Sequence, residues 1–410
     1  MNKLFRFRIF FVLAFFFLIS PIDITSFIDK MTSSHKFLRS HILNIAKVLV
    51  PLKDRILSRT VLDNLVRLQS TGTCQFCDLT GAPMNGLNLS GLDLRYANLS
   101  GANLSGTILS RTSLTNANLM KANLTDAKLI KAKLNRAILT SANLNRANLS
   151  KATMREATMI NANLSRAILI NANLSRATLS NVNLKHAKLS GTILSEASLV
   201  NANLERANMT DAKLNGTKLN RANLTNANLK RADLAGAILI KANMRGVNLN
   251  GSRLTQANLS KVDLSKVNLT CANLSEANLS EANLREINLS GSNLDDADLS
   301  RVDLSKANLF GSSLRRTSLI EANLSGANLS EVNLRGAILT KANLERSNLY
   351  KANLASESSV ISYLNKVNLN YANLSDADLF EADLDSAILT NAFFCNTRMP
   401  NGVINNISCY

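Results

Sequence analysis

The sequence from residue 97 to residue 106 reads Ala97-Asn98-Leu99-Ser100-Gly101-Ala102-Asn103-Leu104-Ser105-Gly106, and this five-residue pattern fills most of the 410-residue chain. Every fifth residue from Leu79 to Leu389 is Leu or Met, except Ser359. Two residues before each of them stands a small or β-branched residue, usually Ala. A helix cannot keep this pattern on one face, because a step of five residues turns about 140° around its axis.

The Ala-x-Leu triplet of each unit alternates inward, outward and inward, as a short strand does. Two polar residues follow the triplet and can turn the chain. One such strand cannot bury its apolar side chains alone, so the pattern predicts a solenoid whose coils stack and share one core. Proline is absent between Met84 and Met399, which suits a backbone ladder that uses every N–H group.

The units resemble the pentapeptide-repeat family, whose consensus A-(D/N)-L-x-x is matched by Ala102-Asn103-Leu104-Ser105-Gly106 and dozens of later units. The resemblance implies an all-β solenoid, a right-handed, four-sided β-helix with four units per coil. At a coil spacing of roughly 4.8 Å, about sixteen coils would form a rod of roughly 75 Å. We assign residues 73–394 to this β-helix and residues 395–410 to a C-terminal hairpin or cap.

The first 72 residues precede the repeats and have a different composition. Lys3, Arg6 and Arg8 precede an apolar run from Ile9 to Ile19, which is typical of a signal peptide or an uncleaved signal-anchor. We assign residues 1–25 to this signal peptide or anchor, and we expect residues 1–20 to be an apolar helix and the full chain to associate with membranes. Residues 26–72 show helical periodicity, first as a basic amphipathic helix that ends at Pro51 and then as a helix over about 54–68 that would cap the solenoid.

The chain has five cysteines. Cys74 and Cys77 flank the start of the repeats, and a hairpin around Pro400-Asn401-Gly402, centred on Gly402, would bring Cys395 opposite Cys409. Both pairs are candidate disulfides, which would favour an oxidising compartment, although in a reduced cell they could simply fill space. Cys271 would be exposed. The segments around the four paired cysteines resemble the first and last segments of bacterial, especially cyanobacterial, family members.

The repeat is interrupted at Ser356-Glu357-Ser358-Ser359. The inward positions there would hold Glu357 and Ser359, and an unpaired carboxylate in an apolar tube is costly. The segment should therefore leave the rod as a loop near residues 355–363, either as a binding contact or as a tolerated irregularity.

Catalytic and metal-binding motifs are absent from the sequence. The three histidines, His35, His41 and His186, offer no nucleophile-base set, and Cys74-Gln75-Phe76-Cys77 lacks two further zinc ligands. We expect no enzyme activity, no cofactor and no metal. N-glycosylation triplets such as Asn98-Leu99-Ser100 arise automatically from the repeat.

The chain is basic, with 47 Lys and Arg against 29 Asp and Glu and a formal net charge of +18. Some family members act as DNA mimics that bind topoisomerases through an acidic surface, and the basic charge here disfavours that function. We instead predict a non-catalytic scaffold of the cell envelope that presents a rigid rod to an unknown protein partner, with the repeats in the periplasm or thylakoid lumen. The alternatives are a cytoplasmic location and a scaffold for nucleic acid or another polyanion, although no aromatic stacking surface supports nucleic-acid binding.

With twenty residues per coil, residues twenty apart at the turns should stack along the rod. One such column forms a candidate basic edge that could dock an anionic membrane surface or an acidic partner. Its members are Arg146, Arg166, His186, Arg206, Lys266, Lys306, Arg346 and Lys366. The column half a coil away, from Arg136 to Asp376, mixes Arg with acidic residues.

Overall fold

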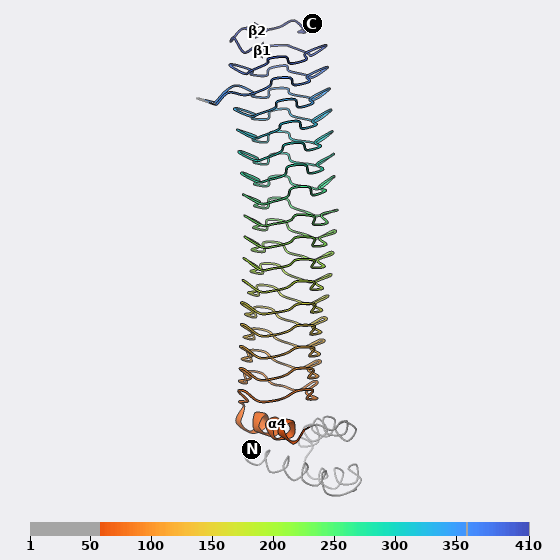
Figure 1. Cartoon of the computed structure of the whole chain (residues 1–410), viewed down its shortest axis with the longest axis vertical. Helices are drawn as coiled ribbons and strands as arrows, with labels where there is room; N and C mark the ends of the chain where they lie inside the picture. Colours follow the sequence, from red (N-terminus) through yellow and green to blue (C-terminus); the bar gives the residue numbers. More distant parts are fainter. Residues whose placement is uncertain (1–57, 358–359, 410) are drawn as a thin grey trace.

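The computed structural model describes residues 58–357 and 360–409, which form one long rod of stacked coils (Figure 1). The elements in chain order are α4 (Arg59–Thr71), the coils, and a small C-terminal hairpin of β1 (Thr397–Arg398) and β2 (Ile404–Asn405). The apolar helix expected in residues 1–20 and the first amphipathic helix lie outside the described residues. Within the described ranges, no helix has the length and apolar character needed to span a membrane.

Each coil contains twenty residues, or four five-residue units. The middle residue of each triplet forms a parallel bridge with the residue twenty positions later, as in Asn98↔Asn118 and Asn118↔Ile138. Backbone hydrogen bonds accompany these bridges, for example from the N–H of Leu99 to the carbonyl of Asn118 at 2.6 Å. The chain is therefore a β-solenoid, in which single bridges replace long strands. The right-handed, four-sided outline stays a prediction from the resemblance.

The five-residue unit folds this way because each residue has a distinct role. The side chains of Ala and Leu fill the core; Leu224, for example, is fully buried. The Oδ1 atom of the Asn between them accepts a hydrogen bond from the backbone N–H two residues later, as Asn98 does from Ser100 at 3.2 Å. The fifth residue has a positive φ, +65° at Gly101, and the Ala102 N–H then donates to the Leu99 carbonyl, as in a type II turn.

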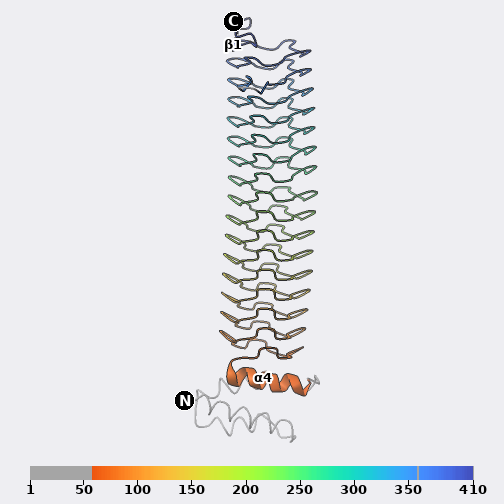
Figure 2. The ribbon, with the colours of Figure 1, turned by 60° about the vertical axis from the view of Figure 1, so that its left-hand side comes forward.

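Helix α4 covers the N-terminal end of the core. Ser58 caps its first turn, and its side chain accepts a hydrogen bond from the N–H of Val61. Val61, Leu65 and Leu68 are buried and belong to the same apolar cluster as the coils. The helix lies across the first coil in both ribbon views (Figures 1 and 2). It starts at Arg59 and ends at Thr71, so it begins and ends later in the chain than the range 54–68 read from the periodicity.

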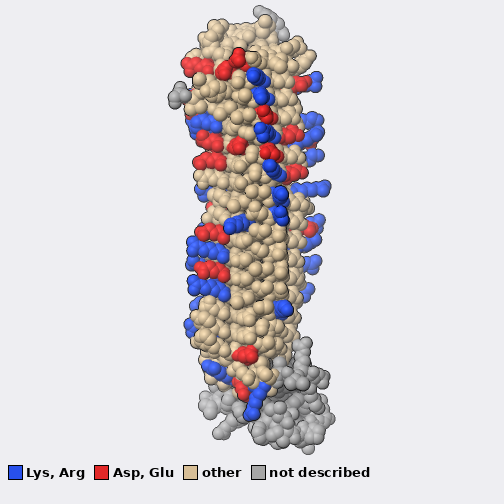
Figure 3. Space-filling model, viewed as in Figure 1, with Lys and Arg blue, Asp and Glu red and all other residues tan. Residues whose placement is uncertain are grey.

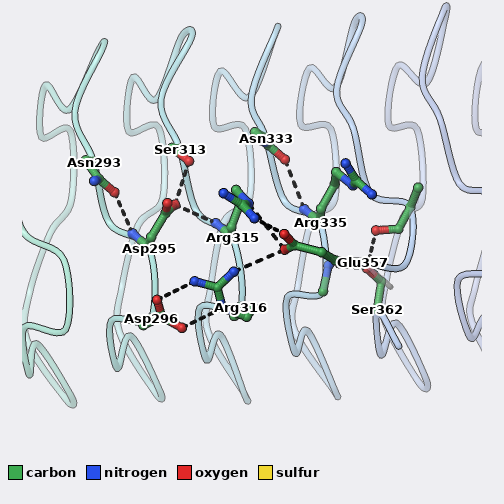
Figure 4. A network of polar contacts seen from close by, with 12 residues as sticks. Asn293, Asp295, Asp296, Ser313, Arg315, Arg316, Asn333, Arg335, Glu357 and Ser362 are labelled. Carbon is green, nitrogen blue, oxygen red and sulfur yellow. Dashed lines mark hydrogen bonds and ion pairs between the residues drawn. The ribbon is translucent and has the colours of Figure 1, made fainter. Parts of the chain in front are cut away.

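A loop leaves the rod between Leu354 and Ser362 (Figure 1). Its backbone is closed by an antiparallel bridge between Glu357 and Val360. The Glu357 side chain, which the repeat would have pointed into the core, instead lies outside it and forms ion pairs with Arg315 and Arg316. The Glu357 Oε2 atom is 3.2 Å from Nε of Arg315 and 3.3 Å from Nη1 of Arg316 (Figure 4). Because the loop leaves the rod, the Glu357 carboxylate is not buried unpaired in the apolar core, and its charge is paired with two arginines.

The C-terminal hairpin has a different centre from the one that the sequence suggested. Thr397 pairs with Asn405 and Arg398 with Ile404, so the hairpin is centred on Asn401 and not on Gly402. The reason lies in the turn, where the Gly402 N–H donates to the carbonyl of Met399, and Gly402, with a φ of +83°, falls after the midpoint. Cys395 and Cys409 nevertheless meet beyond the two paired residues and are bonded.

Candidate interaction surface

The turn residues with positive φ form four columns along the rod, because each coil has four turns twenty residues apart from their equivalents in the next coil. The predicted basic edge belongs to one of them. Its Lys and Arg side chains are exposed, and His186 is half-buried. The column contains Arg146, Arg166, His186, Arg206, Lys266, Lys306 and Arg346.

Several charges of this predicted edge are neutralised by nearby groups. Arg146 forms an ion pair with Asp126 one coil earlier, with a distance of 2.6 Å between Nη2 and Oδ2. The hydrogen bond from Arg146 holds the pKa of Asp126 below its ordinary value. Lys266 lies 3.4 Å from Glu286. The predicted edge is therefore not uniformly basic. Arg166, Arg206 and Lys306 have no ion pair among the described residues, and the first two lie in the N-terminal half of the edge.

Lys366 does not belong to this column, so its assignment to the edge was wrong. Up to Asn333↔Asn353 the parallel bridges join residues twenty apart. The next four, from Ile338↔Tyr363 to Asn353↔Asp378, join residues twenty-five apart, and the spacing then returns to twenty. The loop adds one whole unit and thereby shifts every later turn to the next column. The residue above Arg346 is Tyr371, and the Arg346 guanidinium carbon lies 5.7 Å from the centre of that ring. Lys366 lies above Lys341 instead.

The column half a coil away from the predicted edge is electrically compensated. Arg136 contacts Glu156 at 2.8 Å, and Arg176 contacts Glu196 at 3.0 Å, each pair bridging two successive coils. The alternating signs that the sequence showed thus become a ladder of ion pairs. Such exposed pairs contribute little to stability, but they leave few free charges for a partner. The same loop shift removes Asp376 from this column, where Glu381 follows Ser356.

A second basic column lies one unit away from the predicted edge and was missed in the sequence. Its N-terminal turns are Arg111, Lys131 and Lys151, all exposed and all in successive coils. The strip between the two columns carries two further exposed lysines, Lys128 and Lys188. The signal for this column is present in the sequence, because Arg111, Lys131 and Lys151 follow the same twenty-residue register as the predicted edge.

We define the basic face as the seven cations between residues 106 and 211 that lie in these two columns or the strip between them and have no ion pair among the described residues. Two other cations of this region, Arg146 and Lys185, are ion-paired with Asp126 and Glu205. The members of the basic face are Arg111, Lys128, Lys131, Lys151, Arg166, Lys188 and Arg206.

Charge also divides the rod along its length. Residues 58–253 contain 25 Lys and Arg against 9 Asp and Glu, a formal net charge of +16. Residues 254–409 contain 13 against 17, a net charge of −4. In the view of Figure 3, charged side chains form rows along the rod, and the acidic ones are more frequent toward the C-terminal end. The basic face therefore lies in the part of the rod with the largest positive charge.

The four terminal cysteines form two bonded pairs in the structure. Cys74 is joined to Cys77, with 5.3 Å between their Cα atoms, and Cys395 is joined to Cys409, with 4.7 Å. Both pairs lie at the ends of the coil stack, next to α4 and within the hairpin. Cys271 is a free thiol and is exposed.

Groups suited to metal binding do not converge in the part of the chain that the structure describes. No three His, Cys, Asp or Glu side chains there lie close enough together to hold a metal ion. His186 stands at a turn of the rod, in the column between Arg166 and Arg206. What the described surface offers is therefore rows of charged and amide side chains at a fixed spacing.

The comparisons with known proteins agree with this architecture. A model of the pentapeptide repeat family matches residues 74–355 and 362–399. The search of curated proteins finds no match.

Among solved structures, HetL from the cyanobacterium Nostoc sp. strain PCC 7120, a pentapeptide repeat protein involved in heterocyst differentiation regulation, is 30% identical. That alignment covers 67% of this chain and 91% of HetL, with a TM-score of 0.22. Rfr23 from the cyanobacterium Cyanothece 51142 is 38% identical over 25% of this chain and 83% of Rfr23, with a TM-score of 0.25. QnrB1, a plasmid-mediated fluoroquinolone resistance protein, is 16% identical over 46% of this chain and 89% of QnrB1, with a TM-score of 0.28. The match to the family model covers well over half of the sequence, and the chain belongs to the pentapeptide repeat family.

Proposed function

We propose that this chain is a non-catalytic scaffold of the cell envelope that presents a rigid β-helical rod to a protein partner. The observation that carries the proposal is the backbone ladder from Thr73 to Arg398, which holds outward-facing residues of successive coils in a fixed register, twenty residues apart except across the loop, where they are twenty-five apart. A surface held this rigidly loses little conformational entropy when a partner binds. The four-sided, right-handed form implied by the family resemblance would give such a rod flat sides.

The loop offers the best-defined contact for a protein partner. Val360, Ile361 and Tyr363 are exposed beside it, with 37%, 46% and 40% of their surface accessible. Exposed apolar side chains grouped at a loop on a rigid support are typical of binding sites. The ion pairs of Glu357 with Arg315 and Arg316 hold the base of this loop against the rod.

The envelope location is supported by two features. The basic and apolar N-terminal sequence resembles a signal peptide or anchor, and the two bonded cysteine pairs suit an oxidising compartment such as the periplasm or thylakoid lumen. A cytoplasmic rod would be expected to keep these thiols reduced.

The test combines location with contact. The full chain, expressed at native level, is fractionated, and a photo-crosslinking residue replaces Ile361 or, as a control, exposed Asn226. Recovery outside the cytoplasm and one defined protein crosslinked from position 361 but not from 226 would support the proposal. Recovery in the cytoplasm would refute the envelope location, and identical crosslinks from both positions would refute the loop contact.

A second candidate is a scaffold for nucleic acid or another polyanion, which the net charge of +16 over residues 58–253 favours. Nuclease treatment before crosslinking separates the two candidates, because only nucleic-acid-dependent complexes would be lost. The same positive charge argues against a mimic of DNA, which requires an acidic surface.

A further inference from the structure

We propose that the basic face binds the surface of an anionic lipid bilayer, so that the N-terminal coils lie along a membrane. The proposal adds a lipid contact to the proposed scaffold and does not depend on which protein the loop binds. It concerns the seven unpartnered cations Arg111, Lys128, Lys131, Lys151, Arg166, Lys188 and Arg206.

The first argument is the geometry of the charges. Successive coils are roughly 4.8 Å apart, so the basic face from Arg111 to Arg206 extends over roughly 25 Å of the rod. Neighbouring cations within it lie less than a Debye length apart and repel one another. An extended anionic surface relieves this repulsion at all seven positions at once, whereas a single small anion could reach only two or three of them.

The second argument is the apolar side chains among the charges. Ile108 and Ile168 lie in the strip between the two basic columns, and Ile130 and Ile170 lie beside the column of Lys131 and Lys151. Ile170 is exposed to 36%, and the other three are half-buried. A mixture of cations and aliphatic side chains suits the headgroup boundary of a bilayer, where the cations contact phosphates and the aliphatic groups contact acyl chains.

The same observations select lipid over nucleic acid. No Phe, Tyr or Trp occurs between Tyr96 and Phe310, so the basic face lacks the rows of aromatic side chains on which successive bases stack in single-strand binding proteins. Four isoleucines beside the cations would meet sugar and phosphate groups unfavourably in a complex with a duplex. The part of the rod beyond residue 253, which has a net charge of −4, would project from the membrane or be repelled by it.

The test compares two matched triple variants of the full chain. The first is R111N, K131N and K151N, on the basic face. The control is K121N, R221N and K241N, in the column half a coil away from that of Arg111, Lys131 and Lys151, where the three cations also lack acidic partners among the described residues. Both variants remove three positive charges from positions of positive φ, and asparagine is already present at such positions, for example Asn161 and Asn171. Both should therefore fold.

Binding is measured by co-sedimentation with vesicles of phosphatidylcholine alone or with half phosphatidylglycerol, at 50 and 300 mM salt. The contribution of the anionic lipid should fall roughly 100-fold for the basic-face variant and much less for the control. Each cation near an anionic surface contributes a factor of roughly five, and three such factors multiply to about 100. Added salt should weaken the binding of the wild-type chain. Equal loss in both variants, or equal binding to both vesicle types, would overturn the proposal.

Lysine acetylation followed by mass spectrometry keeps the test informative if the N-terminal apolar segment dominates sedimentation. Anionic vesicles should slow acetylation of Lys128, Lys131 and Lys188 in the wild-type chain but not of Lys121 or Lys241. Equal acetylation rates with and without vesicles would refute the contact. Protection of the same lysines by duplex DNA and not by vesicles would assign the face to nucleic acid instead.

Discussion

Replacing the buried Leu224 with lysine should break the rod at its middle. Leu224 has no accessible surface, and the same inward column holds Leu204 in the preceding coil and Met244 in the next. Leu→Ala substitutions at such sites cost about 2–5 kcal/mol from lost burial and the cavity left behind. Leu224→Lys should cost more, because it also places an ammonium group among aliphatic side chains that offer it no hydrogen-bond acceptor.

Two control variants, one at the same position and one two residues later, separate the effect of a buried charge from that of the substitution itself. Leu224→Met should cost less than about 1.5 kcal/mol, since it preserves volume and Met already fills equivalent positions at 209 and 244. Asn226→Lys, two residues later at an exposed turn, should be near neutral because Lys occurs at many such turns with positive φ, for example Lys121 and Lys131.

Guanidinium unfolding followed by circular dichroism measures these differences, and limited proteolysis locates them. Because each coil contacts only its neighbours, Leu224→Lys should open the structure locally. Proteolysis should then give two large fragments, and the unfolding curve should not be a single shifted transition. Similar unfolding curves and fragments for Leu224→Lys and Asn226→Lys would refute the assignment of the inward and outward positions.

Three further predictions concern the loop, a carboxylate and the C-terminal hairpin. Glu357→Gln should speed hydrogen exchange over residues 355–362 with little change in melting temperature, because it removes the ion pairs with Arg315 and Arg316. The control Glu331→Gln should leave this exchange unchanged. Unchanged exchange in Glu357→Gln would contradict the role of the ion pairs. The hydrogen bond from Arg95 lowers the pKa of Asp93 to about 2, so NMR should find its midpoint there and Arg95→Gln should raise it toward the ordinary value of about 3.9. Because the folded pKa is depressed, the small stabilisation is present above about pH 3.9 and is lost as the pH falls toward 2; a midpoint near 4 in the wild-type chain would exclude it. Cys395→Ser should lower the opening free energy of the hairpin by about 3 kcal/mol, the value expected for a crosslink that closes a loop of about 15 residues. The loss should appear as faster hydrogen exchange in residues 396–408, and reduction of the wild-type chain should have the same effect. Equal exchange before and after reduction would mean that packing alone holds the hairpin.

The five-residue repeat determines the core because the inward positions depend only on local alternation. Ala102 and Leu104 can be assigned to the interior from the sequence, since a short strand buries both and exposes Asn103 between them. The amide side chains were harder to interpret. The Asn98 side chain accepts a hydrogen bond from the Ser100 N–H in its own turn, and its amide nitrogen donates to Thr80 of the preceding coil at 2.8 Å. Asparagine at this position therefore serves the fold and does not by itself indicate a binding partner.

The charged surface could be predicted only in part, because ion pairs depend on which residues stack in successive coils. Arg146 and Asp126 are twenty residues apart and were open to prediction from the register alone. Glu357 contacts Arg315 and Arg316, forty-two and forty-one residues earlier, and the path of the loop that brings it there follows from no repeat. The basic face differs in this respect, because all its members precede the loop and follow the twenty-residue register.

The loop also explains why a column read from the sequence cannot be continued past it. One added unit is a quarter of a coil, so the inward Leu pattern continues unchanged from Leu354 to Leu364, while every outward side chain moves to the next column. The core is insensitive to this shift because its inward positions are equivalent in all four units. The surface is sensitive because its charges differ between columns, and Tyr371 thus replaces Lys366 above Arg346. An added segment of whole units therefore conserves the stability of the solenoid and changes its recognition surface, which makes such loops positions where binding can change at little cost in folding.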